Sequence, residues 1–181
     1  MSWFDFCELN QIGSRFYHVK CDKQNAAIIA SGMGWIAKPH SLVLHGNPGT
    51  GKTHFSLCLA KEALKAYGLS EILWKKSKKI DTEILDEFNT YGTSKSAIKK
   101  YCDIMCLFID DFGIERATER SERDFYEIID TRWENDLITV ITTNLSQPQI
   151  QKSYGDRILS RLKDSEWVKF NGPDLRGLKY A

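Results

Sequence analysis

The octapeptide Gly46-Asn47-Pro48-Gly49-Thr50-Gly51-Lys52-Thr53 matches the pattern G-x-x-x-x-G-K-[ST] at every fixed position. A short apolar run at residues 41–45 precedes it, and a stretch with helical periodicity follows, closed by Gly68. The glycines allow the backbone to curl so that its N–H groups point inward, and the positive end of the following helix adds to the attraction for anions. A strand, a glycine-rich turn and a helix in this order predict a pocket for the β- and γ-phosphates of a nucleotide.

The last two residues of this phosphate-binding loop (residues 46–53) carry its polar side-chain chemistry. Lys52 adds a positive point charge for the phosphates, and the hydroxyl of Thr53 is placed where it can coordinate a Mg²⁺ ion that bridges phosphate oxygens. We therefore predict ATP and Mg²⁺ as ligands. The residues expected to hold the nucleotide are Gly46, Asn47, Pro48, Gly49, Thr50, Gly51, Lys52, Thr53 and His54.

Short apolar runs alternate with longer helical stretches along the chain. The expected strands are residues 41–45, 71–74, 104–110, 137–142 and 166–170. The expected helices are residues 53–67, 82–89, 94–101, 121–135 and 149–163, the last with a break at Gly155. This alternation predicts an α/β fold in which helices cover both faces of a parallel sheet, with the ligand site beyond the carboxyl ends of the strands.

Two acids follow the longest apolar strand. The run at residues 104–109 is uninterrupted, as in a strand buried on both faces, and it ends in Asp110 and Asp111. We expect Asp110 to hold Mg²⁺. A second acid suits a hydrolase, because Asp111 can orient or deprotonate a water in line with the γ-phosphate. The sequence therefore predicts an ATPase.

Further polar candidates lie after the acidic pair. Asn144 follows the strand at residues 137–142 and is expected to hydrogen-bond the attacking water, although a plain polar turn is an equal alternative. Arg157 and Arg161 lie four residues apart on one face of a helix, where surface solubility is the competing explanation.

Length and composition bound the remaining possibilities. A chain of 181 residues, 42% of them hydrophobic and 27% charged, fits one globular domain, residues 1–181. No apolar run reaches the ~20 residues of a membrane span, so a cytoplasmic protein with no membrane partner is expected. The net charge of +1 gives no general attraction for polyanions, so nucleic-acid binding would need a local patch.

Taken together, these motifs resemble the AAA+ ATPases of the DnaC/DnaI helicase-loader group and the related IstB-like ATPases. The resemblance covers nearly the whole chain. It is carried by the phosphate-binding loop, by residues 106–113 around the acidic pair, by residues 125–144 and by residues 157–162. It implies a P-loop NTPase (AAA+) three-layer sandwich with a five-stranded parallel sheet and no C-terminal helical lid. Residues 1–40 would be an N-terminal extension and helix, and residues 41–181 the core.

The resemblance also implies roles for single residues. Asn144 is similar to the family's sensor residue, and Arg161, with Arg157 as second choice, to the arginine finger that completes a neighbouring subunit's site. A finger implies a homo-oligomer. Arg176 is a further candidate, as a phosphate sensor.

The family binds single-stranded DNA on the segment between the second strand and the acidic strand. Lysines that fall in this interval here are Lys75, Lys76, Lys78, Lys79, Lys95 and Lys99. The aromatic residues Trp74, Tyr91 and Tyr101 lie among them and would be able to stack bases. A solvated charged face is the competing explanation of such a lysine run.

These observations favour a helicase-loader-like ATPase that uses ATP to control binding to single-stranded DNA or to a replicative helicase. One alternative is an IstB-like ATPase that assists a transposase. Another is a small-molecule P-loop phosphotransferase, against which Asp111 and the absent lid argue. A third is an adaptor that binds ATP without hydrolysing it.

Overall fold

The computed structural model describes residues 2–20, 34–35, 37–114 and 117–176. Five strands form one sheet in the order β2-β3-β4-β1-β5, and all neighbouring strands are parallel. Their bounds are β1 Leu42–Gly46, β2 Ile72–Lys76, β3 Cys106–Phe112, β4 Ile138–Thr143 and β5 Glu166–Phe170. The predicted five-stranded parallel sheet is therefore confirmed.

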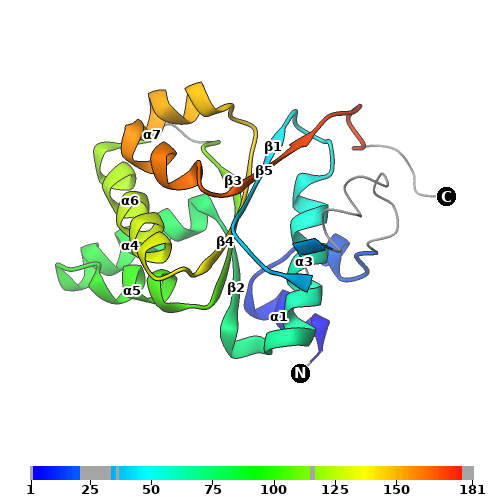
Figure 1. The fold of residues 1–181 in the computed structure, drawn as a ribbon. Coiled ribbons are helices and arrows are strands. Elements are labelled where there is room, and N and C mark those ends of the chain that lie inside the picture. Colours follow the sequence, from blue (N-terminus) through cyan, green and yellow to red (C-terminus); the bar gives the residue numbers. More distant parts are fainter. Residues whose placement is uncertain (1, 21–33, 36, 115–116, 177–181) are drawn as a thin grey trace.

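Helices cover both faces of the sheet. They are α1 Trp3–Leu9, α3 Lys52–Tyr67, α4 Ser77–Tyr91, α5 Lys95–Asp103, α6 Glu119–Glu134 and α7 Gln147–Leu162, with short 3₁₀ turns at Ser14–Phe16 and Leu69–Glu71. Helices α1 and α3 lie on one face and α4 to α7 on the other (Figure 1). The result is the three-layer α/β/α arrangement expected for this alternation of elements.

Two apolar clusters, one on each face, hold the layers together. In strand β3, which lies between β2 and β4, Cys106 and Phe108 belong to the cluster under α3, whereas Leu107 and Ile109 belong to the cluster under α4 to α7. All four side chains are fully buried. Burial on both faces is the reason this strand reads as an unbroken apolar run rather than as an alternating one.

The N-terminal helix shares the cluster under α3. Phe6 and Cys7 of α1 are fully buried there, and the Oδ1 atom of Asn10 accepts the backbone N–H of Trp74 at 2.9 Å. Strand β2 is an edge of the sheet, so this bond satisfies one donor that an edge strand leaves open. The N-terminal segment thereby protects the edge next to β2.

The predicted helices differ from the observed ones mainly at their ends. The largest difference is α4, which begins at Ser77 rather than at residue 82, so that the lysine run at residues 75–79 crosses from the end of β2 into the first turn of a helix. The break at Gly155 is present, with φ 79° and ψ 168° inside α7. Within the described residues, no helix is both long enough and apolar enough to cross a membrane.

Candidate nucleotide-binding site

The phosphate-binding loop joins β1 to α3 at the carboxyl edge of the sheet. Gly46 is the last residue of β1, and Lys52 is the first residue of α3, whose amino end therefore points at the loop. Gly46 has φ 138° and lies opposite Phe170 of β5, where a Cβ atom would stand 2.2 Å from the Phe170 carbonyl oxygen. No side chain fits there, which is the physical reason for glycine at the start of the loop.

Lys52 is folded into this loop. Its Nζ atom donates to the carbonyl oxygens of Gly46 and Asn47 at 2.8 and 2.7 Å, and the residue is only 7% exposed. Burial lowers the pKa of Lys52 below its ordinary value, while the negative charge of Asp111 acts in the opposite direction. The loop thus concentrates an ammonium group and the positive end of a 16-residue helix at one point.

Asp110 lies next to this loop, at the end of β3. Its Oδ1 atom accepts hydrogen bonds from the hydroxyls of Thr53 at 2.8 Å and Thr142 at 2.7 Å. The residue is 1% exposed, and within the described part of the chain its Oδ2 atom has no hydrogen-bond partner. Burial, together with the neighbouring charge of Asp111, raises the pKa of Asp110 to about 6.

These atoms fit a Mg²⁺ ion. A buried carboxylate oxygen without a partner is costly, and a threonine hydroxyl stands beside it. Carboxylate and hydroxyl oxygens are the hard ligands that Mg²⁺ prefers, and a cation would offset the charge that burial makes unfavourable. Thr53 and Asp110, the two residues predicted from the sequence as magnesium ligands, are thus in direct contact.

Asp111 lies in a bulge of β3. Ile109 pairs with Ile141 but Phe112 pairs with Thr143, so β3 contains one residue more than β4 between these pairs. Asp111 has φ 60°, which is unusual for a residue other than glycine. Its side chain is 36% exposed, and its charge is close enough to act on Lys52 and on Asp110. The bulge therefore directs two successive acids toward one site.

Thr142 is a site residue that the sequence analysis missed. Besides its bond to Asp110, its Oγ1 atom accepts the backbone N–H of Asp111 at 2.9 Å. Asn144, the residue expected to serve the attacking water, lies one position beyond β4 and is exposed. The Thr142 hydroxyl could have been predicted as a site group only if the sequence had shown that β3 and β4 are neighbours in the sheet.

The two candidate arginines lie on α7. The Nε atom of Arg161 lies 2.5 Å from Asp130 Oδ1, and the guanidinium stacks 4.2 Å from the Trp133 ring centroid. Arg161 also lines a pocket with Ser41 and Ile138, which lie at the amino ends of β1 and β4. It is therefore at the edge of the sheet opposite its own phosphate-binding loop, and its guanidinium is engaged within the protomer.

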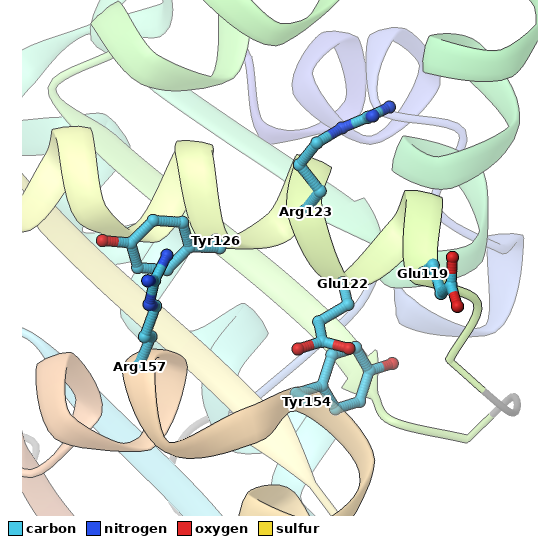
Figure 2. A pocket seen from close by; sticks show the side chains of 6 residues that line it. All are labelled: Glu119, Glu122, Arg123, Tyr126, Tyr154 and Arg157. Atoms are coloured by element: carbon cyan, nitrogen blue, oxygen red, sulfur yellow. The ribbon is translucent and has the colours of Figure 1, made fainter.

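Arg157 occupies a different surface, a groove between α6 and α7. Its guanidinium lies over the Tyr126 ring, 5.7 Å from the centroid (Figure 2). The groove is lined by Glu119, Glu122, Arg123, Tyr126, Tyr154 and Arg157. Arg157 and Arg161 thus share a helix but line different pockets.

Comparison with known protein families identifies the family of this chain. The model of the IstB-like ATP-binding proteins matches residues 11–172, which include the phosphate-binding loop and both acids. This chain belongs to the IstB-like ATP-binding family. It is 26% identical over 182 residues to the replicative helicase loader DnaC of Escherichia coli K12, covering 92% of this chain and 74% of DnaC.

Solved structures agree on the fold. The crystal structure of the DnaC helicase loader matches with a TM-score of 0.77 at 20% identity, covering 88% of this chain and 100% of that one. The crystal structure of DnaI matches with a TM-score of 0.67 at 22% identity, covering 89% of each chain. The predicted resemblance to the DnaC/DnaI group, with its AAA+ fold, is therefore confirmed for this IstB-like chain.

The six candidate DNA-binding lysines of this IstB-like chain do not share one surface. The prediction that Lys75 contacts DNA is wrong, because its side chain is 7% exposed and its Nζ lies 3.3 Å from Glu83 Oε1. Lys76, Lys78 and Lys79 are exposed where β2 leads into α4. Lys95 and Lys99 are exposed on α5, where Lys99 Nζ lies 2.5 Å from Asp103 Oδ2.

Two of the three candidate stacking aromatics are also corrected. Trp74 is 3% exposed and lies in the cluster under α3, and Tyr101 is fully buried with its hydroxyl donating to Glu83. Tyr91 is 75% exposed at the end of α4. Trp74 lies on the buried face of β2. The lysines that follow it in the sequence led to the expectation of an exposed surface.

The two remaining nucleotide-site candidates of the IstB-like chain lie near the loop. His54 is in the first turn of α3, and its Nε2 atom lies 2.8 Å from the Lys20 carbonyl oxygen. Arg176 lies close enough for its positive charge to lower the pKa of Lys52. Both are thus drawn to the same edge of the sheet.

Proposed function

We propose that this chain binds and hydrolyses ATP and uses ATP to control its binding to single-stranded DNA, to a replicative helicase, or to both. The family supplies the first part of this proposal, because its model is that of ATP-binding proteins. The second part rests on the likeness to DnaC, which is named a replicative helicase loader.

One observation carries the hydrolytic part. Thr53 at the end of the phosphate-binding loop donates to Asp110 at the end of β3, and Asp110 keeps a buried oxygen without a partner in the described structure. A loop that only recognised phosphate would not need a second strand to bring a desolvated carboxylate to its last residue. A loop that also serves Mg²⁺ does.

The proposed division of labour follows from these positions. Lys52 exchanges its bonds to the Gly46 and Asn47 carbonyls for the phosphates, so the positive charge stays inside the loop. Thr53 and Asp110 hold Mg²⁺, which when bound neutralises charge that develops on the phosphate oxygens. Asp111, the more exposed acid, orients the attacking water and accepts its proton.

The proposed partners depend on the exposed lysines and on assembly. Lys76, Lys78, Lys79, Lys95 and Lys99 would contact the phosphates of single-stranded DNA, whereas buried Lys75 would not. Arg161, or Arg157 in its place, would complete the site of a neighbouring copy in a homo-oligomer. Asn144 would assist the attacking water.

A second candidate function follows from membership of the IstB-like ATP-binding family. In that case the chain would assist a transposase with the same ATP site. Preference for double-stranded over single-stranded DNA, measured at one salt concentration, would favour this candidate. Likeness to the helicase loader DnaC over 92% of the chain favours the first. The small-molecule phosphotransferase considered from the sequence has no support among these relatives.

Two variants test the ATP site together. Lys52→Ala should weaken ATP binding by on the order of 10-fold or more, because it removes the charge that faces the phosphates. Asp111→Asn should bind ATP normally but hydrolyse it roughly 100-fold more slowly, because an amide keeps the shape and loses the base. Calorimetric titration and steady-state turnover measure the two effects.

Lys65→Ala is the matched control, since Lys65 is an exposed lysine on the same helix. It should behave as wild type in both assays. Unchanged affinity in Lys52→Ala would remove the loop from the nucleotide site. Unchanged turnover in Asp111→Asn would remove Asp111 from hydrolysis. Affinity purification from the native cell with and without ATP would identify the client protein.

A further inference from the structure

Asp111 has a backbone conformation that its neighbours must hold. Its φ of 60° lies in the left-handed region, which residues with a Cβ atom adopt only uncommonly. It also lies in the bulge of β3, where the register with β4 shifts and the regular ladder is interrupted. A strained residue keeps such a conformation only where its surroundings fix it.

Side chains from both sides of β3 hold the peptide groups of Asp111. On the β4 side, Thr142 Oγ1 accepts its backbone N–H at 2.9 Å. On the β2 side, the ladder ends with Lys76 opposite Asp110. The next residue, Ser77, donates its hydroxyl to the Asp111 carbonyl oxygen at 2.9 Å. The Ser77 hydroxyl thus takes the place of a strand N–H, and Asp111 is fixed between two elements.

The Ser77 hydroxyl is directed at Asp111 rather than at its own helix. A serine at the start of a helix often caps it, but the cap position of α4 is Lys76, and no side-chain cap hydrogen bond forms there. Ser77 is 9% exposed, so water does not readily replace its bond to Asp111. The backbone N–H of Ile114 donates to the same carbonyl oxygen at 3.3 Å. Removal of the hydroxyl would therefore loosen Asp111 without leaving this oxygen unpaired.

We propose that Ser77 is a positioning residue for ATP hydrolysis, which together with Thr142 holds Asp111 so that its carboxylate faces the attacking water. This inference rests on the proposed role of Asp111 in hydrolysis. Ser77 acts only through the backbone of Asp111. The hydrogen bonds of Lys52 and Thr53 do not involve Ser77, so nucleotide binding does not depend on it.

The first test separates turnover from binding. Ser77→Ala removes only the hydroxyl and should lower ATP turnover about 10-fold, as is typical when a partner that orients a functional group is lost. Its affinity for a hydrolysis-resistant ATP analogue with Mg²⁺ should match wild type, because the phosphate-binding loop is unchanged. Ser77→Thr keeps the donor and should recover most of the lost turnover. Steady-state turnover and calorimetric titration measure the two quantities.

A double variant tests whether Ser77 acts through Asp111. In the Asp111→Asn background the base is already lost, so the addition of Ser77→Ala should slow hydrolysis no further. If the loss of about 10-fold persists in this background, the hydroxyl acts on another part of the site or on the fold as a whole, and the inference is overturned.

Thr90→Val is the matched control, because the exposed Thr90 hydroxyl donates to the Asp86 carbonyl oxygen at 2.7 Å on the same helix. It should match wild type in turnover and in affinity. Full turnover in Ser77→Ala, or a loss of ATP affinity as large as the loss of turnover, would overturn the role of Ser77 alone. Absence of ATP turnover in wild type would overturn the proposed function. Unchanged turnover in Asp111→Asn would remove Asp111 and Ser77 from the mechanism together.

Discussion

Thr142 organises the acidic pair through a single hydroxyl. It donates to Asp110 Oδ1 and accepts from the backbone N–H of Asp111, so it holds both acids in the bulge of β3. It is 1% exposed, and water cannot readily replace either bond. Thr142 itself has no proposed chemical role, but it fixes the positions of Asp110 and Asp111, which do.

We predict that Thr142→Val lowers ATP turnover roughly 10-fold or more, as is typical when a partner that orients a metal ligand is lost. The free energy of unfolding should fall by about 1–3 kcal/mol, because a buried donor is left unpaired while the shape is kept. Turnover assays and urea unfolding measure these effects.

Thr142→Ser is the matched variant, since it keeps the hydroxyl and removes only a methyl group. It should recover most of the turnover lost in Thr142→Val. Equal turnover in the valine variant and wild type would show that the hydroxyl does not support the site.

Among the elements, the junction of α5, α6, β3 and β4 depends on Arg132. Its guanidinium is fully buried and is surrounded by oxygen atoms of the backbone and one hydroxyl. It donates to the carbonyl oxygens of Tyr101, Cys102, Ile104, Met105 and Ile138 and to Thr139 Oγ1. Burial lowers the pKa of Arg132 to about 10, so the group remains charged at neutral pH.

We predict that Arg132→Met destabilises the protein by about 3 kcal/mol or more, because several buried polar groups would be left without a donor and each costs about 1–3 kcal/mol. Several carbonyl oxygens at the end of α5 and the starts of β3 and β4 would lose their donor. Urea unfolding monitored by circular dichroism gives the value.

Arg123→Met is the control on the same helix, because the Arg123 side chain is 73% exposed. Its effect should stay within about 0.5 kcal/mol. A loss in Arg132→Met no larger than in this control would mean that the junction does not need the guanidinium.

The start of α4 is the element on which proposed DNA binding depends. Lys76, Lys78 and Lys79 are exposed there, and Ser77 Oγ donates to the Asp111 carbonyl oxygen at 2.9 Å. The lysine-bearing turn is therefore attached to the backbone of the acidic pair.

We predict that reversing Lys76, Lys78 and Lys79 to Glu abolishes salt-sensitive binding to single-stranded DNA. Fluorescence anisotropy between ~50 and ~200 mM salt measures it. ATP affinity is measured on the same variant, because Lys76 Nζ lies 3.8 Å from Asp111 Oδ2. Reversal of Lys65 on α3, Lys152 on α7 and Lys163 directly after α7, all three exposed, is the control of equal charge change.

DNA binding that survives the first triple reversal, or that is lost equally in the second, would contradict an interface at the start of α4. Absence of binding by wild type at the lowest salt would remove DNA from the proposed function. Lys75 is left out of the test because burying an unpaired Glu beside Glu83 would disturb folding.

In an assembly of several copies, an arginine of one copy would complete the ATP site of its neighbour. Arg161 lies at the edge opposite its own loop and is paired with Asp130 and stacked on Trp133. An exchange of these partners for a neighbour's phosphate would have to accompany assembly. Arg157 on the α6–α7 groove is the alternative donor.

We predict that Arg161→Ala leaves ATP affinity near wild type and lowers the turnover of assembled protein by on the order of 1,000-fold, as arginine fingers do in related phosphoryl-transfer systems. Mixing Arg161→Ala with Lys52→Ala should partly restore turnover, since a mixed interface pairs an intact loop with an intact arginine. Arg157→Ala, assayed in the same way, identifies which arginine acts. A mixture that stays inactive, although native mass spectrometry shows mixed oligomers, would rule out action between subunits.

Local pattern alone was sufficient for the architecture. The phosphate-binding loop, the apolar run before Asp110 and the alternation of strands and helices are encoded within short stretches, because backbone curvature, strand burial and helix periodicity each depend on neighbours in sequence. The five parallel strands, the break at Gly155 and the family resemblance were all predictable on that basis.

Contacts between distant segments required the folded chain. The strand order places Thr142 beside Asp110, and β-sheet burial turns Trp74 and Lys75 inward. The tail brings Asp174 against Gly49, 125 residues away in sequence at positions 174 and 49. The order of the strands and the position of a bulge produce no periodic pattern in the sequence, since both depend on the packing of whole layers and on hydrogen bonds between strands. The chemical roles of the side chains were therefore predictable from the sequence, whereas the partner of each side chain was determined by tertiary packing.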